Sequence, residues 1–314
     1  SGSAVATVAA IGGMTIPAMK DEGYDPDYSA ALSSAASLLG PMIPPSITLI
    51  VYAGLTEASV QKLFLATLTP AILCTVAFLA YTLWYGKKKN LPKQPKKTAK
   101  EAGKIMLDAI WALLLPVIVL GLIFSGATTV TEAAAVSCLY SAVVSLFIYK
   151  TITFKDLLKI LGDSAVSIAA IMILVGMSKA TAYVVISSQM PQLFMDFITS
   201  ITDSRFVVLL IINVIFLILG CLMEGNCIIV MMVPLLLTLV KSFGIDLLQF
   251  GVMSANIYIG CITPPVGVSL LLGCKLGKTS VGGTFKAILP FFAISMVILI
   301  LVTYWPSFTL WLIH

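Results

Sequence analysis

Apolar residues fall in long runs along this chain, and two of these runs resemble each other. The first reads GPMIPPSITLIVYAG (40–54) and the second reads GCITPPVGVSLLLGC (260–274). Pro264 stands 220 positions after Pro44, and with one residue of slippage further positions come into register: Gly23-Tyr24-Asp25 with Gly244-Ile245-Asp246, Ser59 with Ser280, Phe64 with Phe285, and Pro70 with Pro290. The pattern predicts two copies of one unit, each containing an interrupted apolar helix.

The apolar runs predict a series of membrane segments. These are a short one at 1–19, an interrupted one at 28–56, full spans at 62–85, 105–124, 131–149 and 164–186, arms at 206–222 and 227–240, a second interrupted one at 247–276, and a last span at 285–306. The two arms are short for crossing about 30 Å, so they predict a re-entrant hairpin with its tip at Glu224-Gly225-Asn226. Segment 1–19 resembles the second arm of an equivalent hairpin, with Ser1-Gly2-Ser3 near its tip. Its first arm is expected upstream, in N-terminal spans that the chain lacks.

Composition supports a membrane protein. Hydrophobic residues make up 59% of the 314 residues, the mean hydropathy is +1.06, and 11% are charged, against about 25% in soluble domains. The six cysteines lie in apolar segments without a CxxC pair, which predicts small apolar residues and no disulfides. The only histidine is His314, so catalysis by histidine and metal sites built from histidines are excluded.

Lysine placement predicts the orientation. The linker 86–104 contains eight Lys and is expected in the cytoplasm. Counting spans from it puts fifteen basic residues inside and three outside (Lys62, Arg205 and Lys241), with the C-terminus periplasmic. The two hairpins then open to opposite sides, as in inverted repeats. The predicted organisation is a first repeat at 1–85, the linker 86–104, intervening spans at 105–186 and a second repeat at 187–314.

The Pro-Pro pairs have chemical consequences. Proline removes a backbone donor and blocks the preceding turn, so two in a row should unwind each helix. Carbonyl groups freed at membrane depth must face protein, water or an ion. Ser46 and Thr263 add hydroxyl oxygens at the two breaks, and Na⁺ is a hard cation that prefers oxygen ligands. The alternative is a pair of kinks that serve packing only.

The hairpin tips are the other candidate groups. Each tip begins a helix, and the N–H groups at a helix N-terminus suit an anionic substrate group. Glu224 has three open roles: cation ligand, residue that orients the tip, or charge stabilised at a helix start. Lys179 is costly inside a membrane unless it is paired or faces a cavity, and it is a candidate for contact with an anion.

In order along the chain, SGSAVATVAAIG, GYD, PPSI, SGATTVTEAAAVSCLYS and TPPVG resemble the large membrane (M, DctM-like) subunit of tripartite ATP-independent periplasmic (TRAP) transporters. The resemblance implies an all-α polytopic membrane protein with inverted repeats, re-entrant hairpins and broken helices that works as an elevator. It also implies Na⁺-driven import of an organic acid, such as a C4-dicarboxylate or sialic acid, across the bacterial inner membrane. A periplasmic substrate-binding protein and a small four-helix membrane subunit are the implied partners; no nucleic acid is expected.

By the same resemblance, two Na⁺ sites map onto the chain. The first site comprises Gly2, Ser3, Gly40, Pro45 and Ser46, and the second comprises Gly225, Asn226, Gly260, Thr263, Pro264 and Gly267. The candidate substrate residues are Ser1, Ser3, Asn226 and Lys179. The second break has Val266 where the first has Ser46, so cation binding there is expected to depend more on carbonyl groups and Thr263.

Three other functions are compatible with parts of the sequence. A divalent-anion symporter would carry organic acids with Na⁺ but without a binding protein. An intramembrane hydrolase could pair Ser178 with Lys179 as nucleophile and base, although adjacent helical residues point about 100° apart. A passive scaffold subunit would tolerate alanine at both Pro-Pro pairs without losing transport.

Overall fold

The structure is a computed structural model that describes residues 2–91 and 98–313. The regular elements in these ranges are helices. The chain forms two compact units, one made of Ser1–Pro92 with Met177–His314 and the other of Lys93–Gly176. The repeat and linker boundaries predicted from the sequence stay predictions.

Seven helical segments among the described residues are long and apolar enough to cross a membrane. They are Pro26–Thr56, Val60–Lys88, Gly103–Phe124, Val130–Ile148, Arg205–Leu222, Gly225–Ser242 and Val281–Tyr304. An all-α polytopic membrane protein is therefore confirmed. Both arms of the predicted second hairpin are among the seven, and their re-entrant course stays a prediction.

In the larger unit, the first repeat begins with one continuous helical segment. It consists of α1 (Ala4–Thr7), the π-helical turn η1 (Val8–Gly12) and α2 (Gly13–Asp21). The interrupted helix follows as α3 (Pro26–Ala36), α4 (Leu39–Met42) and α5 (Ile47–Thr56), and the long α6 (Val60–Lys88) comes next. The break lies at residues 43–46, where the sequence predicts it.

The second repeat has the same order of elements. Its hairpin is α11 (Arg205–Leu222) with α12 (Gly225–Ser242), and its interrupted helix is α13 (Leu247–Ser254), α14 (Ile257–Cys261) and α15 (Val268–Gly277). The long α16 (Val281–Tyr304) and the short α17 (Pro306–Leu310) follow. The break at residues 262–267 again surrounds the predicted Pro-Pro pair.

Matching residues start and stop matching helices. Asp25 and Asp246 accept hydrogen bonds from backbone N–H groups at the starts of α3 and α13. Further pairs 221 positions apart share their local structure: Ser59 and Ser280 as N-caps, Gly23 and Gly244 with positive φ, and Glu57 and Lys278 in the left-handed conformation. The starts of α3 and α13, of α5 and α15, and of α6 and α16 differ by 221 positions, whereas the Pro-Pro pairs, and Pro70 with Pro290, differ by 220.

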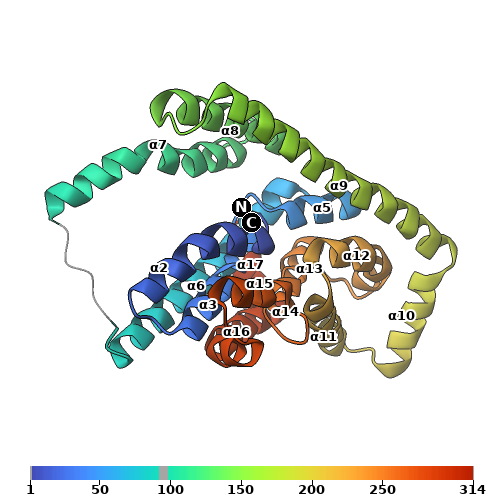
Figure 1. Cartoon of the computed structure of the whole chain (residues 1–314). Helices are drawn as coiled ribbons and strands as arrows, with labels where there is room; N and C mark the ends of the chain where they lie inside the picture. Colours follow the sequence, from blue (N-terminus) through green and yellow to red (C-terminus); the bar gives the residue numbers. More distant parts are fainter. Residues whose placement is uncertain (1, 92–97, 314) are drawn as a thin grey trace. The chain divides into compact units, whose positions relative to one another are not determined.

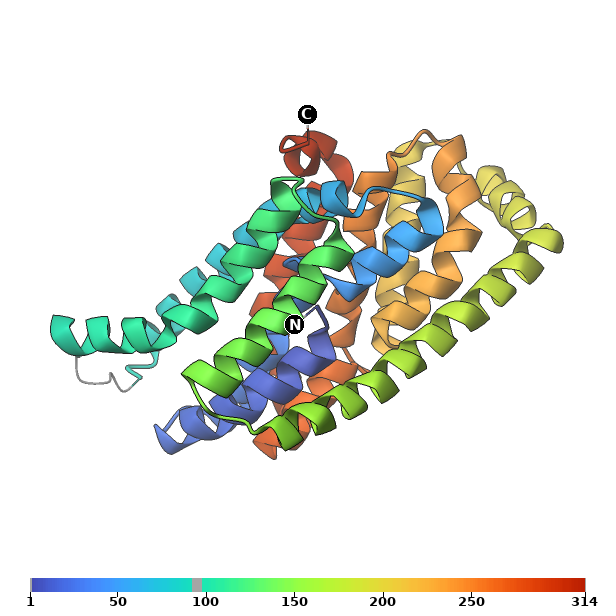
Figure 2. The ribbon, with the colours of Figure 1, turned by 90° about the horizontal axis from the view of Figure 1, so that it is seen from above.

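The helices that follow the breaks exchange partners between the repeats. Helix α5 packs against α12 of the second hairpin, whereas α15 packs against η1 and α2 of the first repeat and against α3 (Figure 1). The long helices α6 and α16 also lie against each other (Figures 1 and 2). The two repeats therefore share one core within this unit.

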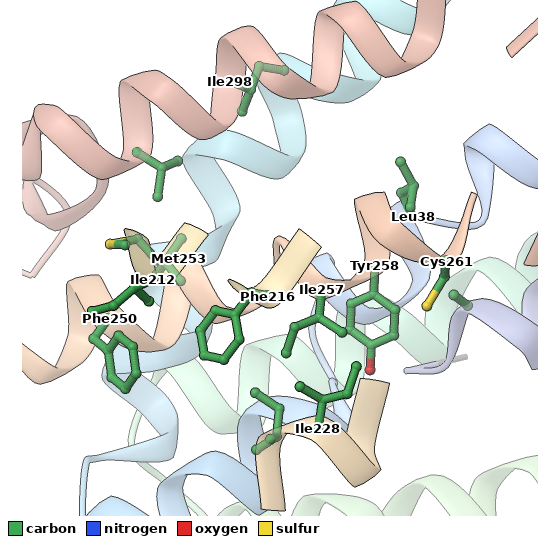
Figure 3. Packing of buried hydrophobic residues seen from close by; sticks show 14 of the residues in the cluster. Leu38, Ile212, Phe216, Ile228, Phe250, Met253, Ile257, Tyr258, Cys261 and Ile298 are labelled. Carbon is green, nitrogen blue, oxygen red and sulfur yellow. The ribbon is translucent and has the colours of Figure 1, made fainter. Parts of the chain in front are cut away.

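Large apolar side chains fill that core around the second interrupted helix. Phe216 of α11, Ile228 of α12 and Phe250 of α13 are fully buried and lie close together (Figure 3). Helices α11 and α14 approach closely at two glycines, because a Cβ on Gly220 would lie 2.2 Å from the Ile257 carbonyl oxygen, and one on Gly260 would lie 2.6 Å from the Gly220 Cα. Only residues without a side chain allow this contact.

The smaller unit contains α7 (Ala99–Phe124), α8 (Val130–Val143), η2 (Val144–Ile148) and most of α9 (Phe154–Ser187), which continues into the larger unit. Helix α8 begins with a capping box in which the Glu132 carboxylate accepts a hydrogen bond from the Thr129 backbone N–H. Tyr140 and Tyr149 donate to carbonyl groups of α7, at Trp111 and Asp108. These bonds tie α8 and η2 to α7.

Two features differ from the sequence prediction. Helix α9 begins at Phe154 and not at 164, because Asp156 accepts hydrogen bonds from the Thr153 hydroxyl and N–H; these bonds also lower the pKa of Asp156. The helix α10 (Met190–Ile201) was not predicted. It packs against α12 and buries Pro191 and Ile198.

We expect Gly220→Ala to destabilise the larger unit by about 1–3 kcal/mol, because the added methyl group must push α11 away from α14. Thermal unfolding of the detergent-purified protein measures this change. Gly54→Ala is the matched control, since a Cβ on Gly54 meets no atom within 4 Å. Equal melting temperatures for the two variants would contradict the close contact.

Candidate functional site

The first hairpin tip touches the first break. Gly2 is buried with a φ of +71°, and a Cβ there would lie 2.9 Å from the Pro45 carbonyl oxygen and 3.2 Å from the Ile47 nitrogen. Glycine thus satisfies both the backbone conformation and the close approach. The structure brings Gly2 and Pro45, two predicted members of the first site, into contact.

Two serine hydroxyl groups cap the helices at this contact. The Ser3 Oγ accepts from the Ala6 N–H, and the fully buried Ser46 Oγ accepts from the Leu49 N–H, both at 3.4 Å. A hydroxyl oxygen has two lone pairs, so the Ser46 Oγ keeps one for a further partner. Gly40 lies in α4, which packs against α1, and its N–H donates to the Ser37 carbonyl.

The second break is capped by the hairpin beside it. The Val266 and Gly267 N–H groups donate to the Cys221 carbonyl at the end of α11, at 3.2 and 3.0 Å. Gly267 has a φ of +48°, and a Cβ there would lie 2.7 Å from the Thr263 carbonyl oxygen and 3.2 Å from that of Cys261. Two carbonyl groups therefore converge on Gly267, and Cys221 and Cys261 join the site through their backbones.

The other predicted members of the second break have defined roles. The Thr263 hydroxyl donates to the Ile259 carbonyl at 2.9 Å, which leaves its lone pairs for another partner. Gly260 is packed against Gly220, and its carbonyl accepts from the Thr263 N–H. Pro264 forms a cis peptide bond with Pro265, as Pro44 does with Pro45.

At the second hairpin tip, Glu224 serves as the N-cap of α12. Its Oε2 accepts from the Asn226 and Cys227 N–H groups at 2.8 and 3.3 Å, and its Oε1 accepts from the Asn226 Nδ2 at 2.9 Å. Of the three roles left open by the sequence, the structure therefore shows a helix-start charge that also orients the tip.

The second tip lies against the start of α5, next to the first break. The Thr48 Oγ1 donates to the Asn226 Oδ1 at 2.9 Å and also bonds the Tyr258 hydroxyl. Gly225 sits on the Tyr258 ring, where a Cβ would lie 2.8 Å from ring carbons. Asn226, predicted with the second cation site, is thus bonded to the first repeat, and sequence reasoning missed both Thr48 and Tyr258.

Ser269 is a further polar residue that the sequence analysis missed. It is the counterpart of Thr48 at an offset of 221, and it is fully buried two residues after Gly267. Its hydroxyl has no hydrogen-bond partner among the described residues. A buried unpaired hydroxyl is costly, so this oxygen suits a ligand.

The oxygen atoms at the two breaks are neutral hydroxyl and carbonyl groups. In the described part of the chain, no group of three Cys, His, Asp or Glu residues could hold a metal ion. Carbonyl and hydroxyl oxygens fit a hard monovalent cation better than a transition metal, so the residues present fit Na⁺. Ser1 and the side chain of Lys179 lie outside the described residues.

Comparison with known proteins identifies the family. A family model described as "Tripartite ATP-independent periplasmic transporter, DctM component" matches residues 1–308. The chain is 38% identical over 311 residues to the C4-dicarboxylate TRAP transporter large permease protein DctM of Pseudomonas aeruginosa, covering 99% of the chain and 73% of that protein.

Two further relatives carry the same kind of name. The sialic acid TRAP transporter large permease protein SiaM of Vibrio cholerae is 34% identical, with 99% of the chain and 73% of that protein covered. The isethionate TRAP transporter permease protein DctMQ of Oleidesulfovibrio alaskensis is 36% identical, with 98% and 49% covered. These are transporter permeases and not enzymes, which removes the hydrolase alternative. The chain therefore belongs to the DctM family, the large permease component of the tripartite ATP-independent periplasmic transporters.

Proposed function

We propose that this chain is the conducting core of a Na⁺-coupled importer of an organic acid across the bacterial inner membrane. A periplasmic binding protein delivers the acid and a small four-helix membrane subunit supports the permease. The relatives are named for C4-dicarboxylates, sialic acid and isethionate, and these acids share a negative charge. The hairpins and broken helices are proposed to move together as an elevator.

The observation that carries the proposal is the contact of each break with a neighbouring hairpin segment. Gly2 lies on the first break, and the Cys221 carbonyl of α11 accepts from the Val266 and Gly267 N–H groups of the second. Each contact leaves hydroxyl and carbonyl oxygens inside the protein, where an unpaired oxygen is costly. A bound Na⁺ would pair these oxygens and supply positive charge beside the tips.

The two tips offer different surroundings to an anion. Glu224 already occupies the first N–H groups of α12 with a carboxylate, whereas the cap of the α1 segment is the neutral Ser3. An anionic group is therefore proposed to bind on the side of Ser1 and Ser3, with Asn226 facing it from the second tip. Lys179 is the remaining candidate for contact with the anion.

The test is labelled organic-acid uptake by liposomes that contain the full-length permease with its small membrane partner. Uptake should require both an inward Na⁺ gradient and the cognate binding protein. Uptake that needs Na⁺ but no binding protein would instead support a divalent-anion symporter. Equal uptake with and without an inward Na⁺ gradient would overturn the proposal.

We expect Ser46→Ala and Thr263→Ala each to raise the Na⁺ concentration for half-maximal uptake about tenfold, since each removes one oxygen facing the cation. Sodium titration of the uptake rate measures this shift. Ser46→Ala also removes a helix cap worth about 1 kcal/mol.

Ser59→Ala is the matched control for Ser46, because Ser59 caps α6 with the same 3.4 Å bond away from both breaks. It should lower stability without changing the Na⁺ dependence. For Thr263, serine should restore the dependence that alanine impairs. Wild-type Na⁺ dependence in both alanine variants would refute the two sites.

Ser269→Ala should affect the melting temperature differently with and without Na⁺. Because the hydroxyl is buried and has no partner in the part of the chain that the structure describes, its removal should leave the melting temperature unchanged or higher when Na⁺ is absent. The same variant should lose part of the stabilisation that Na⁺ gives, if this oxygen binds the cation. Full Na⁺ stabilisation in Ser269→Ala would remove this residue from the site.

A further inference from the structure

A chain of hydrogen bonds connects the second hairpin tip to both interrupted helices. It runs through Tyr258 of α14, Thr48 of α5, and Asn226 and Glu224 at the start of α12. Thr48 and Tyr258 are 0% and 3% exposed, and the Tyr258 hydroxyl points toward the helix that carries Ile228 (Figure 3). These four residues are called the tip relay below.

The direction of donation along the tip relay follows from proton counts. Thr48 has one hydroxyl proton, and at 2.9 Å it goes to the Asn226 Oδ1. Tyr258 must then donate its proton to the Thr48 oxygen, since two hydroxyl groups in contact need one donor. Donation therefore runs from Tyr258 through Thr48 to Asn226, and each bond polarises the next.

The carboxylate at the end of the tip relay holds this direction. Glu224 only accepts hydrogen bonds, so the Asn226 amide must turn its Nδ2 toward the Oε1 of Glu224 at 2.9 Å. A flipped amide would place two oxygens against each other. Glu224 thereby keeps the Asn226 Oδ1 directed at Thr48.

The other repeat does not contain this chain of bonds. The counterparts of Tyr258, Thr48, Asn226 and Glu224, at an offset of 221, are Ser37, Ser269, Val5 and Ser3. Ser37 donates instead to the Ser34 carbonyl at 2.6 Å, valine has no polar side-chain atom, and the Ser269 hydroxyl is unpaired among the described residues. The fold of the repeat therefore does not require a tip relay.

We propose that the tip relay couples cation binding at the first break to closure of the second hairpin tip. This inference rests on the proposed Na⁺-coupled transport. A cation held by Ser46 fixes the start of α5, including Thr48 two residues later, and Thr48 then holds Asn226 and the tip. By linkage, a closed tip raises the affinity of the first cation site to the same degree. Tyr258 and Thr48 are positioning residues and do not touch the cation.

Tyr258→Phe tests the coupling, because phenylalanine keeps the ring beneath Gly225 and removes only the hydroxyl. In liposomes with the full permease, the Hill coefficient for Na⁺ should fall toward 1 and the half-maximal Na⁺ concentration should rise about two- to tenfold. In detergent, the rise of the melting temperature with Na⁺ concentration should become less cooperative.

Tyr52→Phe is the matched control. Tyr52 is fully buried and its hydroxyl donates to the Leu247 carbonyl at 2.6 Å, outside the tip relay. It should lose stability while the Hill coefficient stays at the wild-type value. A purely structural role for Tyr258 would give the same result in both tyrosine variants, and that outcome would overturn the inference.

Thr48→Val and Thr48→Ser separate the hydroxyl from the shape of the side chain. Thr48→Val should reproduce the effect of Tyr258→Phe, whereas Thr48→Ser should keep the coupling. The double variant Thr48→Val/Tyr258→Phe should have little more effect than either single variant. Additive effects would overturn the inference. If uptake by the wild-type permease does not depend on Na⁺, the proposed function fails. If the Hill coefficient for Na⁺ is above 1 in the wild type and equally high in Tyr258→Phe, only the proposed coupling fails.

Discussion

The constraint that shapes the larger unit is that backbone polar groups inside a bilayer must find partners within the protein. Each proline pair interrupts a helix whose backbone N–H and C=O groups would otherwise bond one another. The N–H and C=O groups freed at each break therefore need hydrogen-bond partners from other segments. The second break obtains them from the Cys221 carbonyl, which accepts two N–H groups of the unwound segment. The hairpins are thus structural requirements of the breaks, and their tips must lie where the backbone is open.

Internal duplication gives the two halves a common scaffold but different chemistry. The breaks differ after the proline pair: α5 begins directly after Ser46, which caps it with a hydroxyl, whereas α15 begins one residue later in register, after Gly267, which has no side chain. The tips differ in the same way, with neutral Ser3 at one and the Glu224 carboxylate at the other. A pair of equal sites is therefore not expected, even though the helices match closely.

The sequence predicts the local features well because they depend on local chemistry. Proline pairs mark the breaks, and the matched Asp25 and Asp246, which the sequence places in register, both cap helices that begin the interrupted segments. The polar contacts were missed because they join distant parts of the chain. Thr48 meets a partner 178 positions away, and no periodicity reports this pairing. Helix α10 was missed because its 12 residues are too few to cross a membrane.

Glycine at both tips explains why these distant contacts form at all. Gly2 and Gly225 let a helix start lie directly on the Pro45 carbonyl and on the Tyr258 ring, where any side chain would collide. At the second tip, this proximity allows Asn226 to bond Thr48, so protein groups fill the contact. At the counterpart positions, the smaller Ser37 and the apolar Val5 make no such bond, and the Ser269 hydroxyl has no partner among the described residues. Under the proposed function, protein side chains make the contact at the second tip, whereas the transported ion and acid complete the contact at the first.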